Sequence, residues 1–143
     1  MRKVEVSCPI TATMNIIGGK WKAVILWYLR EYPLRFGELH KKMPKCSLKI
    51  FNADLKELEK EGIIKREVFA EVPPKVEYSL TDYGKTLLPV IIILRQWGVK
   101  RLLDFPELMK DNEELQHFIK VISETEDLSF LNNLKVFRNT ING

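Results

Sequence analysis

Apolar residues recur at helical spacing through most of the chain. In residues 47–61 they follow steps of three and four, which predicts an amphipathic helix with one inward stripe. That stripe consists of Ile50, Phe51, Leu55 and Leu58. Ser47 has the side chain of a helix N-cap, and Gly62 follows as a stop. We therefore expect a helix of about four turns here.

The pattern changes to that of β-structure directly after Gly62. The apolar stretches Ile63–Phe69 and Val76–Leu80 predict two strands, and the loop 71–75 between them should be exposed. Pro73 and Pro74 cannot donate ladder hydrogen bonds, so they should form a stiff tip. A helix followed at once by such a hairpin predicts a winged helix.

The other elements follow from capping and stop signals. Cys8 and Pro9 fit the cap and first position of a helix that Gly18-Gly19 ends. The remaining expected elements are a helix over 20–31, a short strand over 34–36, a helix over 37–43 and a helix from Thr81 to 103. The expected class is α+β and mostly α, a winged helix-turn-helix with a two-stranded wing and helical dimerisation elements.

The helix expected over 81–103 is apolar around nearly its whole circumference. A small domain can cover only one side of such a helix, so the other side needs a second partner. We expect that partner to be another copy of the chain, with Leu88, Ile92 and Trp97 in the interface. Pro89 should kink the helix.

Residues 104–143 continue in helical patterns and are expected to form an extension beyond the domain at 1–103. One apolar stripe comprises Leu115, Phe118, Ile119 and Ile122, and another comprises Leu128, Leu131, Leu134 and Phe137. A disordered tail would not carry this much regularly spaced apolar surface. The extension should pack on the body or on a partner subunit.

The net charge of +4 conceals an asymmetry along the chain. Residues 1–103 hold 19 Lys and Arg against 11 Asp and Glu, whereas residues 104–143 hold 4 against 8. A basic body favours a polyanionic partner such as nucleic acid, although scattered solvated charge would give the same totals.

Cysteine use and hydropathy indicate a cytoplasmic protein. The two cysteines make no disulfide framework, and the start of the chain lacks the apolar core of a signal peptide. The longest strongly apolar run, residues 87–94, is too short to cross a bilayer, so we expect no membrane association.

The predicted helix over 47–61 should present Lys49, Asn52, Ala53, Lys56 and Lys60 away from its apolar stripe. In isolation this could be an ordinary solvated face. A tight turn before the helix and a hairpin bearing Lys75 after it favour a duplex reader, with the helix in the major groove and the hairpin on flanking DNA. The alternative is a winged helix that binds another protein.

Sequence motifs for enzymatic chemistry are weak. There is no glycine-rich phosphate loop, no HExxH and no Cys-x-x-Cys motif. His40 and His117 are far apart and are better explained as surface or satisfied histidines than as metal ligands. We expect no enzyme activity, cofactor or metal, and the sequence does not identify a small-molecule effector.

Four segments together resemble the HxlR-type winged-helix transcription regulators. These segments are CPITATMNIIGGKWKAVILWYL, PLRFGELHKKMP, LKELEKEGIIKREVFAEVPPKVEYSLTDYGKTLLPV and QWG, which occur in order over about residues 8–98. The resemblance implies a homodimeric DNA-binding regulator related in fold to the MarR group. Its dimers are held by the first and last helices of the domain, which adds Ile10 and Met14 to the expected interface.

The resemblance and the residue pattern together give the expected DNA-binding set. It comprises Arg35, Ser47, Lys49, Asn52, Ala53, Lys56, Pro74 and Lys75. Leu48 and Ala53 depart from the family pattern, because polar residues are common at both places. Leu48 could touch a thymine methyl group or could turn inward.

Cys8 occupies the place of a redox-active cysteine in some members of this family. A thiol at a helix cap faces the positive end of the helix, and Arg2 and Lys3 are close in sequence, so both should favour the thiolate. The alternative is a small packing residue. Cys46 is expected to be a packed apolar residue in the turn before the recognition helix.

Overall fold

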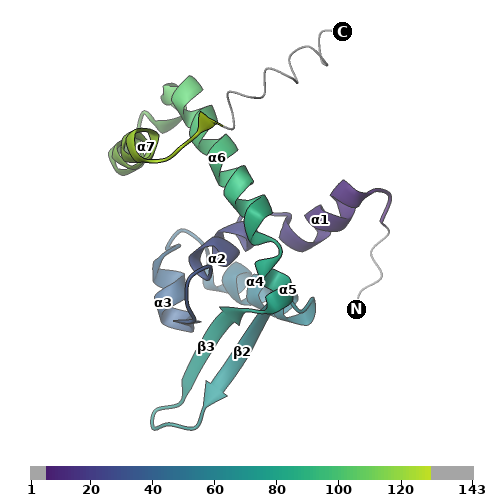
Figure 1. Ribbon diagram of the computed structural model, residues 1–143. Helices are drawn as coiled ribbons and strands as arrows, with labels where there is room; N and C mark the ends of the chain where they lie inside the picture. Colours follow the sequence, from purple (N-terminus) through teal and green to yellow (C-terminus); the bar gives the residue numbers. More distant parts are fainter. Residues whose placement is uncertain (1–5, 130–143) are drawn as a thin grey trace. The chain divides into compact units, whose positions relative to one another are not determined.

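The computed structural model describes residues 6–129 and divides into two compact units, Met1–Ile91 and Ile92–Gly143. In the first unit the elements are α1 (Pro9–Ile17), α2 (Lys22–Tyr28), β1 (Leu34–Arg35), α3 (Phe36–Lys41), α4 (Leu48–Lys60), β2 (Ile64–Phe69), β3 (Lys75–Leu80) and α5 (Asp82–Lys85). Helix α6 (Leu88–Asp104) begins in the first unit and continues into the second (Figure 1).

The hairpin is confirmed, and it is part of a slightly larger sheet. The strands are antiparallel in the order β1-β3-β2, with Leu34 opposite Tyr78 and Arg66 opposite Tyr78 from the other side. The short strand expected over 34–36 therefore pairs with the wing and anchors its base beside α3. The rest of the hairpin projects away from the helices (Figure 1).

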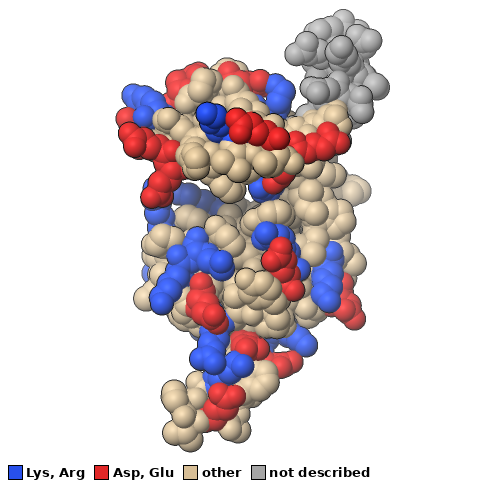
Figure 2. All heavy atoms as spheres, turned by 60° about the vertical axis from the view of Figure 1, so that its left-hand side comes forward, with Lys and Arg blue, Asp and Glu red and all other residues tan. Residues whose placement is uncertain are grey.

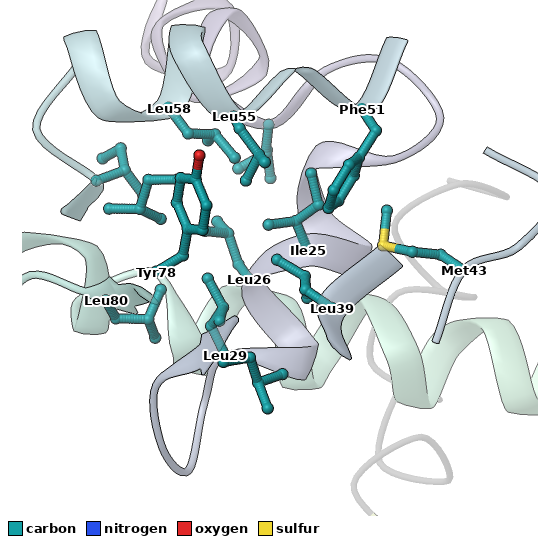
Figure 3. Packing of buried hydrophobic residues seen from close by; sticks show 14 of the residues in the cluster. Ile25, Leu26, Leu29, Leu39, Met43, Phe51, Leu55, Leu58, Tyr78 and Leu80 are labelled. Carbon is teal, nitrogen blue, oxygen red and sulfur yellow. The ribbon is translucent and has the colours of Figure 1, made fainter. Parts of the chain in front are cut away.

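The core of the first unit lies between α2, α3, α4 and the sheet. Phe51, Leu55 and Leu58 on α4 are fully buried against Ile25 and neighbouring apolar residues (Figure 3). Burying a side chain of this size stabilises the fold by about 1.5–3 kcal/mol, so the inward stripe of α4 fixes which side of the helix remains outside.

Local signals set the ends of α4 and the attachment of β3. Gly62 has a φ of 73°, a left-handed conformation that glycine adopts without a Cβ penalty. The Thr81 hydroxyl donates to the carbonyl oxygen of Gly62 at 2.6 Å and accepts from the Gly84 N–H at 2.9 Å. Thr81 thus caps α5 and ties the end of β3 to the turn after α4.

Three expectations about helices need correction. The single helix expected from Thr81 to 103 is two helices, because α5 ends at Lys85 and α6 starts at Leu88. Pro89 lies in the first turn of α6, where a missing N–H breaks no helical bond, and so it kinks nothing. Ile50 is exposed instead of joining the inward stripe.

The second unit has its own small core. It contains the later part of α6, the 3₁₀ helix η1 (Pro106–Met109) and α7 (Glu113–Thr125). The core residues are Val99, Met109, Ile119 and Ile122, with Leu102, Leu115 and Leu128 packed against them. The Arg95 guanidinium forms two bonds to the Glu126 carboxylate, at 2.7 and 3.0 Å, which joins α6 to the end of α7.

One member of the expected α7 stripe lies outside this core. Phe118 is exposed, at 6.0 Å from the Arg95 guanidinium. Leu131, Leu134 and Phe137 of the second expected stripe lie outside the described residues. The expected boundary between the body and an extension at 103–104 stays a prediction.

Candidate nucleic-acid interface

The turn that precedes α4 is held by side chains as well as backbone. Cys46 is buried, as expected, and its carbonyl oxygen lies 2.8 Å from His40 Nε2. The His40 ring also packs on Phe51, with centroids 5.0 Å apart. His40 is thus the satisfied histidine that the sequence suggested, and the start of α4 is fixed in place.

Helix α4 begins at the predicted cap. The Ser47 hydroxyl accepts a hydrogen bond from the Ile50 N–H at 3.2 Å, which satisfies one of the otherwise unpaired donors of the first turn. Ser47 is exposed and stands at the end of the helix where a recognition helix usually meets DNA.

The exposed face of α4 carries a line of lysines. Lys49, Ala53, Lys56 and Lys60 follow steps of four, three and four, so they lie along one side of the helix, opposite the buried stripe. All four are exposed, and none of these lysines forms an ion pair with another described residue. We call these four residues the lysine row; Asn52, also exposed, lies beside it.

Two acidic residues of α4, Asp54 and Glu57, lie to one side of the lysine row, whereas Glu59 is exposed on the other side, which carries Asn52. Glu57 forms an ion pair with Lys22 of α2. Asp54 is half-buried, and burial raises the pKa of its carboxyl group, whereas Lys22 opposes that rise. Both lie on the flank toward Lys22 of α2.

The wing differs from expectation at Lys75. Its ammonium group lies 2.8 Å from the Glu77 carboxylate and 4.9 Å from the centroid of the Phe69 ring. Lys75 is the first residue of β3, and the loop before it, including Pro74, bears no cation. The far end of the hairpin is accordingly dominated by uncharged residues at the bottom of Figure 2.

Arg66 supplies a cation on the wing that is not in the expected DNA-binding set. It is exposed and forms no ion pair within residues 6–129. Because it pairs with Tyr78, it projects from the same face of the hairpin, and Tyr78 lies beside Leu55 and Leu58 of α4 (Figure 3). Arg66 therefore points to the side of the sheet on which α4 lies. Strand alternation counted from buried Ile64 would have identified it.

Arg35 lies on the other face of the sheet. It pairs with Glu77, on the face away from Tyr78, and its backbone N–H donates to Glu38 at the start of α3. Its side chain is exposed. Of the expected DNA-binding set, the members on α4 or at its cap are Ser47, Lys49, Asn52, Ala53 and Lys56. The other members lie on β1 or on the hairpin, namely Arg35, Pro74 and Lys75.

Cys8 caps α1 as predicted. Its sulfur accepts from the Thr11 N–H at 3.4 Å and lies 3.3 Å from the Thr11 hydroxyl, and these two contacts lower the pKa of the thiol. Cys46 is the opposite case, because burial raises the pKa of its thiol. The expected contribution of Arg2 and Lys3 falls on residues outside those described.

The expected interface residues are mostly exposed. Ile10 and Met14 lie on one side of α1, and Ile92 and Trp97 are exposed on α6. Leu88 is half-buried against the core of the first unit. Val90, Ile93, Leu94 and Trp97 follow the spacing of one helical face and are all exposed, so we call them the α6 apolar stripe.

Helices α3 and α4 are joined by a tight turn and are followed by the projecting hairpin of β2 and β3. This arrangement defines a winged helix-turn-helix module. The HxlR-like helix-turn-helix family matches residues 16–104, and the chain belongs to this family. Its relatives are helix-turn-helix transcriptional regulators, and η1 and α7 lie beyond the matched region. Among residues 6–129 no helix is long and apolar enough to span a membrane.

Named relatives agree with this assignment. The uncharacterized HTH-type transcriptional regulator YdeP of Bacillus subtilis is 50% identical over 93 residues, which cover 65% of this chain and 73% of YdeP. The redox regulator HypR in its reduced form superposes with a TM-score of 0.65 at 39% identity, over 70% of this chain and 98% of HypR. The reduced form of the regulator YodB from B. subtilis gives 0.57 at 34%, over 65% and 92%.

Proposed function

We propose that this protein is a homodimer that regulates transcription by binding specific sequences of duplex DNA. The observation that carries the proposal is the lysine row, whose three lysines are exposed and form no ion pair with another described residue, on the outer face of a helix whose start is held by the Ser47 cap and by His40. A helix of this kind fits the major groove, where Asn52 can bond the adenine edge and the lysines can reach phosphates or guanine. Arg66, Arg35 and the wing residues Pro74 and Lys75 would contact flanking DNA.

Replacing Lys49, Lys56 and Lys60 together with alanine is expected to weaken DNA binding about 100-fold at about 0.15 M salt, since each lost phosphate contact costs about five-fold there. The slope of log affinity against log salt should become shallower by about three units at most. Fluorescence anisotropy with labelled genomic fragments at several salt concentrations measures both quantities.

A control triple variant removes the same charge elsewhere, with alanine at Lys85, Lys110 and Lys120, all exposed outside α4. It should lower affinity far less than the α4 variant. Equal losses would mean that binding depends only on net charge. A wild-type protein that binds no duplex at low salt would favour the alternative, a winged helix that binds another protein.

We further propose that Cys8 makes the regulator responsive to thiol chemistry. An exposed thiol with a lowered pKa holds more thiolate at neutral pH, and the thiolate is the reactive form. HypR is a redox regulator by its printed description, and YodB has also been solved after diamide treatment. Cys8 precedes Ile10 and Met14, so modification would act at the proposed dimer interface.

Treatment with benzoquinone is therefore expected to change DNA affinity in the wild type and leave a Cys8→Ser variant unaffected. The Cys8 thiolate forms a C–S bond to a ring carbon, and the ring takes up a proton to give the hydroquinone adduct. Mass spectrometry should show that Cys8 is labelled faster than Cys46, and that the labelling of Cys8 begins at a lower pH than the labelling of Cys46. Equal, slow labelling of both thiols would reduce Cys8 to a packing residue.

A further inference from the structure

Two large apolar side chains are exposed on the first turn of α4. Leu48 is 54% exposed and Ile50 is 48% exposed. Every other exposed residue of α4 is charged or polar, except the small Ala53. Apolar surface at the end of a helix that is otherwise polar outside is a feature that the lysine row does not explain.

The structure fixes these side chains outward. The inward positions of the helix are filled by Phe51 and Leu55, and the turn before it is filled by Cys46. The Ile50 N–H is bound to the Ser47 cap, so the first turn cannot rotate to bury Leu48 or Ile50 without losing the cap. Both side chains are therefore presented before any ligand arrives.

We infer that Leu48 and Ile50 read thymine by packing on its C5-methyl group, which rests on the proposed function of α4. Residues at the start of a recognition helix approach the base edges. Thymine is the base whose major-groove edge carries a methyl group, and apolar side chains recognise it by contact. Leu48 and Ile50 lie on opposite flanks of Lys49, about 160° apart around the helix axis, so at the inserted end of the helix each would reach base edges on its own side of that lysine. Ala53, three residues after Ile50, keeps the adjoining surface small enough for close approach.

The test uses the full-length protein and a duplex selected by it from a random-sequence library. That sequence is synthesised again with deoxyuridine in place of thymidine, one half-site position at a time, which removes only the methyl group. Wild-type affinity should fall about four-fold for each methyl contacted, the factor expected for one buried methyl-sized group. Leu48→Ala and Ile50→Ala should each abolish that difference at one position.

Lys56→Ala is the matched control on the same helix. It should weaken binding to the thymidine and deoxyuridine duplexes alike, leaving their ratio unchanged. Tight wild-type binding with equal affinity for both duplexes, or a selected site without thymine near the helix start, would overturn the inference and leave the proposed function standing. Failure to select any sequence would count against the proposed function itself.

Discussion

Replacing Trp97 with aspartate is expected to convert the protein from a dimer into a monomer. Trp97 is 57% exposed and is a member of the α6 apolar stripe. Burying a side chain of this kind is worth about 1.5–3 kcal/mol, and two-fold symmetry doubles the loss to about 3–6 kcal/mol. The dimer dissociation constant should then rise by about 10² to 10⁴, which sedimentation equilibrium can measure.

Tyr32→Asp provides the control for this substitution. Tyr32 is also an aromatic residue with 57% exposure, but it lies in the turn after α2 and belongs to neither α1 nor α6. It should leave the dimer intact, and circular dichroism should show both variants folded. A wild-type protein that is monomeric at micromolar concentration would remove the dimer proposal and leave the apolar stripe unexplained.

Elements that depend on neighbouring residues in the chain were predictable. Cys8, Ser47 and Thr81 cap α1, α4 and α5 through bonds to N–H groups three residues later. Gly62 follows the end of α4, where the chain adopts a left-handed φ that glycine takes without a Cβ penalty. Such caps act over a single turn, so the sequence alone contains the relevant partners.

Features that depend on tertiary packing were not predictable. Ile50 flanks the inward stripe, one residue before Phe51, and only the extent of the core around the helix decides whether it is covered; it is exposed while Phe51 is buried. The apolar pattern does not reveal the break between α5 and α6, because it continues through Leu87 and Leu88, which both pack on the core. Hydropathy does not distinguish one helix from two when both contribute to the same core.

The candidate site shows the same division. The lysine row follows from helical periodicity, which requires only the position of the buried stripe. Which wing cation is free depends on strand register, because Lys75 and Glu77 project from one face and Arg66 from the other. The sequence places both cations on the wing but does not show that Lys75 pairs with Glu77 along its own strand, which leaves Arg66 as the cation without an ion pair among the described residues.

A Gly84→Ala substitution is expected to destabilise the winged-helix unit by about 3 kcal/mol, at the upper end of the usual range for overpacking. A Cβ at this position would overlap the carbonyl oxygen of Ile63 and lie 3.0 Å from its carbonyl carbon. Backbone atoms cannot rotate away as a side chain can. Chemical denaturation followed by circular dichroism gives the change in the free energy of unfolding.

The same substitution should also disturb the wing. Gly84 donates its N–H to the Thr81 hydroxyl, and that hydroxyl holds the turn after α4 through Gly62. Pushing α5 away from Ile63 would loosen the attachment of β3 to that turn.

Gly37→Ala is the matched control, since a Cβ on this α3 glycine meets nothing within 4 Å. Alanine there should be neutral or stabilising by up to about 1 kcal/mol. Equal stability of the two variants would show that α5 leaves room for a methyl group beside the Ile63 carbonyl group.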